Sequence, residues 1–541
     1  MDSKDDNVLA EISDLYVNFY TYQGTVQAIE GVDLIIKQGE TLGIVGETGC
    51  GKSVTASTIM RLILSPPGKI ESGSIYFMEP PEVRAQRKRY EDDAQAWYQG
   101  LPESEKRKIV ATYGMRFTGF QKRVKPMTTA EASKLAIPQR APFRAVAGHM
   151  NGRVSKVPKG DKVSQEALRK SYDLMGKSGS YMRKIRGRFI SMIFQEPTSA
   201  LNPVFMAGDQ IAEVILQHRK TEMAERALKT IDKEIGLMRE GKRPSKIKVK
   251  DQSGKGASAK KQKCSICGAN VTEADPWCSN CGIEFYSPMS WATRRPVLET
   301  YKRLITFIKK DPDSKNSFIS RVPIVRRYRK YLYEEAIREA VRMLEIVRIP
   351  DPKGVAYRYP YELSGGMQQR VMIAIALACN PKLLIADEPT TALDVTIQGQ
   401  ILKLMRDLKE VYGSSILLIT HNLGVVAEMC DRVGVMYAGS MAEIGTARTI
   451  YKKPLHPYTM GLMKSVPSIQ GDVEKLYTIR GSVPNLIYPP SGCRFHPRCD
   501  FAKSYCTKVK PELLEVEDGH QVACHMASGV KGYVDSGPIA R

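Results

Sequence analysis

The chain has 541 residues, with 81 lysines and arginines against 58 aspartates and glutamates, which gives a formal net charge of +23. Hydrophobic residues make up 42% of it and charged residues 26%, a composition that is ordinary for a globular protein and excludes a mainly disordered chain. The length predicts about three or four structural units. The longest uninterrupted apolar run, residues 371–379, is far shorter than the roughly 20 residues needed to cross a bilayer. Residues 1–7 are acidic and no apolar segment follows, so we expect a cytosolic chain without a signal peptide.

The positive charge is concentrated in two blocks. Residues 79–178 contain 21 basic and 11 acidic residues, and residues 218–333 contain 27 and 12, whereas the remainder holds 33 basic and 35 acidic residues. Both blocks have little clean periodicity, so we interpret them as insertions into another fold, with loops at the glycine-, serine- and lysine-rich stretches 148–161 and 253–261. The chemistry is therefore expected in the near-neutral remainder.

A glycine-rich loop follows the first short buried strand, predicted at residues 41–45. Its pattern, G-x-x-x-x-G-K-S, comprises Gly46, Glu47, Thr48, Gly49, Cys50, Gly51, Lys52 and Ser53. The glycines allow backbone N–H groups to wrap phosphates, and a helix starting near Lys52 adds its positive N-terminal dipole. In such a loop the lysine reaches the β- and γ-phosphates and the serine hydroxyl ligates Mg²⁺. The strand before it and the amphipathic segment 54–64 after it favour this reading over a simple turn.

Polar residues end three further predicted strands. Gln195 follows the apolar strand 190–194, Asp387 and Glu388 follow the strand 383–386, and His421 ends the strand 415–420. Ligands bind at the carboxyl ends of the strands in an open parallel α/β sheet. We therefore expect Asp387 to hold Mg²⁺ and Glu388 to polarise an attacking water, the alternative being two solvated acids at a strand end.

A second candidate phosphate contact precedes a long predicted helix. Ser364, Gly365 and Gly366 stand at its start, where the glycines permit close backbone approach and the helix dipole favours an anion. An ordinary helix cap is the alternative for Ser364.

In this order the motifs resemble those of ATP-binding cassette (ABC) ATPases. Residues 46–53 resemble the Walker A motif, 363–368 the signature, and 383–387 the Walker B motif with Glu388 as catalytic glutamate. By the same resemblance Gln195 is the Q-loop glutamine, a further Mg²⁺ ligand, and His421 is the switch histidine.

Two further assignments come from the same resemblance. Residues 392–394 are similar to the D-loop, which places Asp394 at the nucleotide site. Tyr22 resembles the aromatic residue that stacks on adenine, and Tyr20 lies near enough to be an alternative.

The resemblance implies an α/β fold. Its core is a P-loop ABC ATPase with a mixed sheet and flanking helices, an antiparallel β subdomain and a helical subdomain, here joined by a zinc-ribbon-like insertion and a cysteine-rich C-terminal extension. We expect core segments at 1–78, 183–217 and 334–445, basic insertions at 79–182 and 218–333, and the extension at 446–541.

Three segments resemble one subfamily of the ABC ATPases in particular. Residues 189–203, 386–398 and 454–459 are similar to oligopeptide and dipeptide importer ATPases. The family implies an ATP-hydrolysing subunit, peripheral at the cytoplasmic face of the membrane, that energises import of peptides or, in some members, oligosaccharides. Its implied partners are a second, paralogous ATPase, two membrane permeases and an extracytoplasmic binding protein. The two ATPases close head to tail, so Ser364, Gly365 and Gly366 would contact the partner's ATP.

Eight of the eleven cysteines form two groups. Cys264, Cys267, Cys278 and Cys281 form two C-x-x-C pairs ten residues apart, a spacing that suits tetrahedral structural Zn²⁺ and resembles a zinc ribbon, with iron or no metal as alternatives.

The second group consists of Cys493, Cys499, Cys506 and Cys524, spaced too widely for a zinc knuckle. Its resemblance to the importer tail implies a [4Fe–4S] cluster with four cysteine ligands. Zn²⁺, with His496 or His525 as substitute ligands, and free thiols are the alternatives. Cys50, Cys379 and Cys430 lack metal spacing and are expected to be ordinary apolar residues.

The two basic blocks have three candidate roles. They brace the complex as solvated additions, contact anionic lipid headgroups, or bind nucleic acid. Residues 326–333 alternate aromatic and cationic side chains, which suits base stacking, but an amphipathic helix explains the same spacing and we prefer it. The rival function is a zinc-containing ABC ATPase that acts on nucleic acid in repair or translation. The single Walker A motif and the importer-like tail weigh against that rival.

Overall fold

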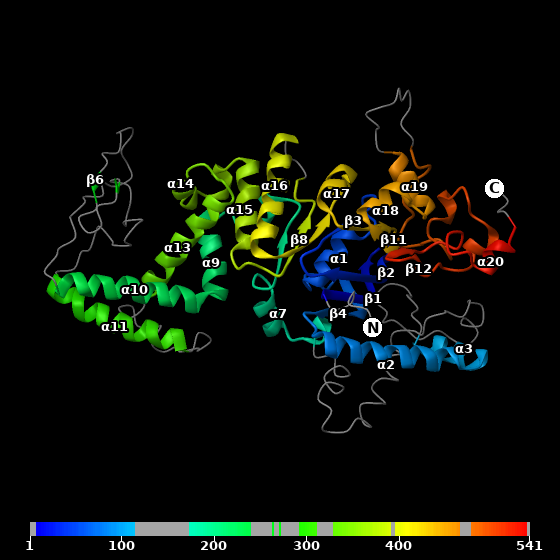
Figure 1. Cartoon of the computed structure of the whole chain (residues 1–541), viewed down its shortest axis with the longest axis horizontal. Coiled ribbons are helices and arrows are strands. Elements are labelled where there is room, and N and C mark those ends of the chain that lie inside the picture. Colours follow the sequence, from blue (N-terminus) through cyan, green and yellow to red (C-terminus); the bar gives the residue numbers. More distant parts are fainter. Residues whose placement is uncertain are drawn as a thin grey trace, which may run out of the picture. The chain divides into compact units, whose positions relative to one another are not determined.

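The computed structural model describes residues 7–113, 172–239, 262–263, 270–271, 291–310, 328–390, 395–465 and 478–537. The chain divides into two compact units, one formed by residues 1–200 with 380–541 and the other by residues 201–379 (Figure 1). The loops predicted at 148–161 and 253–261 lie outside the described residues.

An eight-stranded mixed sheet forms the centre of the first unit. Its order is β12-β13-β11-β10-β3-β9-β8-β5. The five strands from β10 to β5 run parallel, and β11, β13 and β12 add antiparallel neighbours at the other end. The strands span β3 Thr41–Val45, β5 Ile190–Ile193, β8 Leu383–Asp387, β9 Ser415–Ile419, β10 Arg432–Tyr437, β11 Ser440–Thr446, β12 Leu514–Glu517 and β13 His520–Val522.

The central strands are covered on both faces, which explains their continuous apolar sequences. Every residue of β3, β8 and β9 is buried. Helix α1 (Lys52–Ile59) contacts β8, and α17 (Leu423–Met429) contacts β3. Parallel sheets require such covering, and their strands therefore lack the polar alternation of a half-exposed sheet.

A separate antiparallel sheet packs against this core in the order β2-β1-β4. Its strands are β1 Val8–Thr21, β2 Gly24–Lys37 and β4 Gly68–Phe77. Side chains from both sheets, such as Ile12, Leu34, Ile44 and Leu417, belong to one hydrophobic cluster. The mixed sheet with its helices and this antiparallel sheet confirm the predicted α/β architecture. The other helices of the unit are α2 Pro81–Gln99, α3 Glu103–Tyr113, α7 Gly179–Ile185, α8 Pro197–Ala200, α16 Val395–Tyr412, α18 Ala447–Lys452, α19 Pro457–Lys464 and α20 Lys531–Val534.

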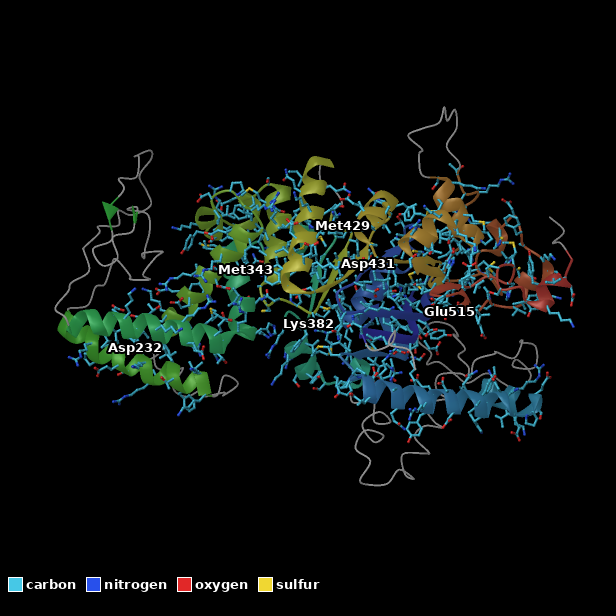
Figure 2. All side chains as sticks on the ribbon, in the orientation of Figure 1. Asp232, Met343, Lys382, Met429, Asp431 and Glu515 are labelled. Atoms are coloured by element: carbon cyan, nitrogen blue, oxygen red, sulfur yellow. The ribbon has the colours of Figure 1, made fainter. Side chains whose placement is uncertain are left out.

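The second unit is helical in its described residues, apart from the two-residue strands β6 Gln262–Lys263 and β7 Asn270–Val271. Its helices are α9 Ala207–His218, α10 Lys220–Arg239, α11 Trp291–Lys310, α13 Tyr328–Ile346, α14 Pro352–Ala356 and α15 Gly365–Leu377. Helices α10 and α11 run side by side (Figure 1). Ion pairs join them, one of which links Asp232, labelled in Figure 2, to Lys302 at 2.5 Å. The helix expected within residues 326–333 is confirmed from Tyr328 onward.

Long helices make up most of the described part of each basic block, which the weak periodicity of these segments did not predict. Helix α2 in the first block is anchored by buried charge. Arg87 is fully buried, and its guanidinium pairs with Glu11 of β1 at 2.8 Å and with Glu79 at 2.9 Å. The same group lies 3.7 Å from the centre of the Tyr76 ring. Burial raises the pKa of Glu11, but the charges of Arg87 and Lys88 outweigh it and bring that pKa to about 2.

Removing the cation from this cluster should destabilise the first unit. In Arg87→Met the carboxylates of Glu11 and Glu79 stay buried without their main counter-charge, a change that typically costs about 3–5 kcal/mol. Urea unfolding followed by circular dichroism measures the loss. Arg89→Met changes an exposed arginine on the same helix and is the matched control. An Arg87→Met protein as stable as this control would contradict the role assigned to the cluster.

Candidate active site

Polar residues that follow four strands lie together at the carboxyl ends of the parallel strands of the mixed sheet. Strands β3, β9, β8 and β5 are consecutive neighbours and parallel, so their carboxyl ends lie together. The register is level, because Ile419 pairs both with Ile44 near the end of β3 and with Asp387 at the end of β8. The sheet therefore brings together segments that are hundreds of residues apart in the sequence.

The loop after β3 has the backbone that a phosphate-binding loop needs. Gly46, Gly49 and Gly51 have φ values of 155°, 82° and 103°, a region that side chains disfavour. At Gly46 a Cβ atom would lie 2.2 Å from the carbonyl oxygen of Met436. The buried Lys52 turns back over the loop, and its Nζ donates to the carbonyl oxygens of Gly46 at 2.7 Å and Glu47 at 3.1 Å. The remaining loop members, Thr48 and Cys50, complete the turn into α1.

Ser53 and Asp387 meet across the sheet edge. The Ser53 hydroxyl donates to Oδ1 of Asp387 at 3.0 Å. Burial raises the pKa of Asp387, and the neighbouring Glu388 raises it further, while the hydrogen bond from Ser53 lowers it. A hydroxyl and a buried carboxylate at this distance supply the oxygen ligands that Mg²⁺ prefers.

Glu388 lies between Gln195 and His421. Its Oε2 accepts from Nε2 of Gln195 at 3.0 Å, and its Oε1 lies 3.1 Å from Nδ1 of His421. Glu388 has a φ of 45°, in the left-handed region that is uncommon for residues other than glycine. Such strained backbone persists where its surroundings hold it, often at functional sites. The three side chains come from the ends of β8, β5 and β9, so the sheet edge gathers them.

The signature segment lies in the second unit. Ser364 precedes α15 in an extended conformation, and its side chain makes no capping hydrogen bond. Ser364 and Gly365 are exposed, and a Cβ atom at Gly365 would meet nothing within 4 Å. Gln368 ties the segment to the preceding turn by donating to the carbonyl oxygen of Pro360 at 2.8 Å. Gly366 follows in the first turn of α15, whose N–H groups face no acceptor within the helix.

Two of the three remaining residues that were predicted to contact the nucleotide lie in the described part of the chain. Tyr22 is 97% exposed at the turn between β1 and β2. Tyr20 donates its hydroxyl proton to Glu71 at 2.6 Å, which engages it within the sheet. Asp394 lies outside the described residues.

The C-terminal extension contacts the phosphate-binding loop, a feature that the sequence did not indicate. The N–H of Glu47 donates to the hydroxyl oxygen of Tyr458 at 2.9 Å. The carboxylate of Glu47 pairs with both terminal nitrogens of Arg498, at 3.0 and 3.1 Å. Glu47 and Arg498 are 451 residues apart, and no spacing rule connects positions so distant.

Four cysteines of the extension line one pocket with apolar neighbours such as Phe495 and Tyr533; they are Cys493, Cys499, Cys506 and Cys524. Backbone N–H groups of Phe495 and Phe501 approach the sulfurs of Cys493 and Cys499. Burial, and then the neighbouring thiols, raise the pKa of each of these two cysteines to about 12. Among the residues that the structure describes, no three His, Cys, Asp or Glu side chains are arranged to hold a single metal ion.

The structure describes the two candidate histidine ligands and the three cysteines outside the predicted metal groups, but not the candidate zinc ligands. His496 and His525 line the same pocket, each with one ring nitrogen within 2.9 Å of a backbone carbonyl oxygen. Cys50 and Cys430 are buried and Cys379 is half-buried, and none of these three cysteines is in a disulfide. The candidate zinc ligands Cys264, Cys267, Cys278 and Cys281 lie outside the described residues. No helix in the described ranges is long and apolar enough to span a membrane.

Comparison with known proteins gives two family matches. The ABC transporter family matches residues 29–141 and 292–391, and the oligopeptide/dipeptide transporter C-terminal region matches residues 442–506. The oligopeptide transport ATP-binding protein AppD of Bacillus subtilis is 31% identical over 520 residues, covering 96% of this chain and 97% of AppD. The dipeptide transport ATP-binding protein DppD of the same organism is also 31% identical, covering 95% of this chain and 93% of DppD. The dimeric structure of the bacterial ABC transporter cassette MJ0796 covers 81% of this chain and 99% of its own, at 16% identity and a TM-score of 0.39.

Proposed function

Because the chain belongs to the ATP-binding subunits of oligopeptide and dipeptide ABC transporters, we propose that it hydrolyses ATP to energise peptide import. The observation that carries this proposal is the arrangement around Glu388, with Gln195 and His421 on its two carboxylate oxygens and Ser53 paired with the adjacent Asp387. These groups come from four strands and converge at one edge of the sheet.

Each residue has a specific part in the reaction. The N–H groups of the loop Gly46–Ser53 and the ammonium of Lys52 bind the phosphates, for which Lys52 leaves the carbonyl oxygens that it now contacts. Ser53 and Asp387, with Gln195, would hold Mg²⁺, which neutralises charge that develops on the phosphate oxygens.

Glu388 and His421 act on the attacking water. Glu388 accepts a hydrogen bond from the water and orients it toward the γ-phosphate, and His421 positions Glu388 and the transferring phosphoryl group. Such catalysis depends on positioning, which a carboxylate held from both sides supplies, and on charge stabilisation, to which the ammonium of Lys52 contributes.

The signature residues serve a second ATPase subunit. Ser364, Gly365 and Gly366 present an exposed helix start, which suits contact with ATP held by the partner's Walker A loop. In this arrangement Tyr22 stacks on adenine and Asp394 belongs to the nucleotide site.

The role of Glu388 is tested by Glu388→Gln in the assembled transporter. The amide keeps the size of the side chain but cannot polarise water, so ATP binding should persist while steady-state hydrolysis falls by at least about 100-fold. Phosphate release and equilibrium ATP binding are measured together. Glu428→Gln makes the same chemical change at an exposed surface pair with Arg406 and should leave both unchanged. Normal hydrolysis in Glu388→Gln would refute the assigned role.

The partners and the location follow from the same family. We propose a peripheral position at the cytoplasmic face of the membrane, two permeases, an extracytoplasmic binding protein and a paralogous second ATPase. The insertions proposed at 79–182 and 218–333, between core segments 1–78, 183–217 and 334–445, bring basic helices that suit contact with anionic lipid or with these partners. The extension at 446–541 completes the proposed organisation.

Affinity purification of the full chain from native membranes tests the partners. Permease subunits should stay bound to the chain during a wash at high salt. Their contact with the chain is between proteins and does not depend mainly on phosphate charge, as the binding of nucleic acid does. Nucleic acid that binds in their place and is released by salt would favour the rival function in repair or translation.

For the cysteine-lined pocket we propose a [4Fe–4S] cluster. A cubane cluster holds four thiolates farther apart than one metal ion does, so four cysteines around one pocket suit it although no single-ion geometry is present. N–H groups directed at the sulfurs of Cys493, Cys499 and Cys524 are the contacts that stabilise cluster thiolates. The described residues around the pocket indicate no redox substrate, so we propose a structural or sensing role. Structural Zn²⁺ at Cys264, Cys267, Cys278 and Cys281 is proposed from their spacing alone.

Anaerobic purification tests the cluster. The protein should be brown, with broad absorption in the visible range, and Cys499→Ser should lower the iron content and this absorption together. Cys379→Ser changes a cysteine that does not line the pocket and is the matched control. A colourless anaerobic preparation, whether it contains stoichiometric zinc or no metal at this site, would overturn the proposal.

A further inference from the structure

The second residue of the phosphate-binding loop is held by the C-terminal extension at two of its three polar groups. The N–H of Glu47 donates to Tyr458 at 2.9 Å, and its carboxylate makes a two-pronged ion pair with Arg498. The third group, the carbonyl oxygen, accepts from Nζ of Lys52 at 3.1 Å. Glu47 is therefore the point at which the extension and the phosphate-binding lysine meet.

Arg498 is fixed in the orientation that this pairing needs. Its side chain is 7% exposed, whereas that of Glu47 is 27% exposed. Its Nε donates to the carbonyl oxygen of Arg480 at 2.8 Å, and its terminal nitrogens also donate to the carbonyl oxygen of Gly481 and the hydroxyl of Tyr437, both at 3.3 Å. A guanidinium held in this way loses little conformational freedom when it pairs with a carboxylate.

Tyr458 is equally constrained. The residue is fully buried, and its ring packs against Tyr437 and Phe495 with centroid distances of 4.6 and 5.5 Å. The hydroxyl that accepts from Glu47 therefore sits on a rigid aromatic cluster and not on a mobile side chain. The extension thus presents two prepositioned groups to one residue of the loop.

The charge of Glu47 gives these contacts a consequence for nucleotide binding. A carboxylate in a loop that receives phosphates repels them, and the repulsion is stronger where water is partly excluded. Paired with Arg498, the carboxylate is neutralised, and the loop keeps its shape before nucleotide arrives. Preorganised sites bind more tightly because less order is lost on binding.

We propose that Arg498 is a positioning residue for ATP binding, which acts from the C-terminal extension by neutralising and orienting Glu47 of the Walker A loop. The proposal rests on the proposed ATPase function and adds to it a residue outside the recognised motifs. Tyr458 assists by fixing the backbone of the same loop residue.

The test compares Arg498→Gln, Glu47→Gln and the double variant in the full-length protein. Arg498→Gln leaves the Glu47 carboxylate uncompensated, so the affinity for Mg-ATP should fall about tenfold, while kcat at saturating ATP changes little. In the double variant the repelling charge is gone, so most of the lost affinity should return. A residue that served only folding would show no such rescue.

Affinity is measured with a fluorescent ATP analogue, and kcat and KM are measured in the assembled transporter. Arg480→Gln is the matched control, because it removes an exposed arginine of the same extension and keeps the carbonyl group that Arg498 contacts. Tyr458→Phe, which loses only the hydroxyl, should weaken binding by a smaller factor and provides a second test if Arg498→Gln folds poorly.

Two results would overturn the inference. One is an Arg498→Gln protein, or a folded Tyr458→Phe protein in its place, that binds ATP as tightly as the control. The other is a double variant as weak as Arg498→Gln alone. Either result leaves the ATPase function intact as long as the unsubstituted chain binds ATP, whereas a chain that does not bind ATP at all refutes the proposed function itself.

Discussion

The parallel alignment of four neighbouring strands is the constraint on which the site depends. Strands β3, β9, β8 and β5 run in one direction, and the row that joins Ile44, Ile419 and Asp387 keeps their ends level. Polar groups at the end of each strand are therefore neighbours, whatever their distance in the sequence. The buried interior of the sheet supplies the rigidity, since β3, β8 and β9 have no exposed residue that could respond to solvent. The chemistry is placed on the ends of a structure that does not itself need to move.

The sequence predicted the parts of this site that are local. The glycine pattern of residues 46–53 reflects backbone requirements that show directly in residue types, because only glycine readily adopts the φ values found at Gly46 and Gly51. Apolar runs predicted β3, β8 and β9 to within a residue, since burial on both faces leaves little freedom of composition. The positive φ of Glu388 was not predictable, because its neighbours and not its residue type impose it.

The sequence did not predict contacts between distant segments. The pair Glu47 and Arg498 depends on how the extension folds back onto the core, and neither residue is unusual in its own segment. The helices of the basic blocks were missed for a different reason. The buried side chains of α2 include Arg84 and Arg87. Because arginine is polar, the buried face of this helix does not show up as a periodic pattern of apolar residues. Part of the large positive charge is therefore internal and compensated, and only the rest is available to lipids or to other proteins.

The extension has a further consequence for the sheet that it joins. Strand β13 pairs with β11, and β12 pairs with β13, so the outermost strand is not the apolar β11 but a segment with two exposed glutamates, Glu515 and Glu517. Figure 2 labels Glu515 at this margin. Charged side chains on an edge strand discourage pairing with another chain. A chain shortened before residue 514 would expose the backbone N–H and C=O groups of β11 as an open edge, and it would leave the fully buried Glu443 without its 2.7 Å contact to His520. The C-terminal extension thus protects the sheet from aggregation through β12 and β13, and it holds the phosphate-binding loop through Tyr458 and Arg498.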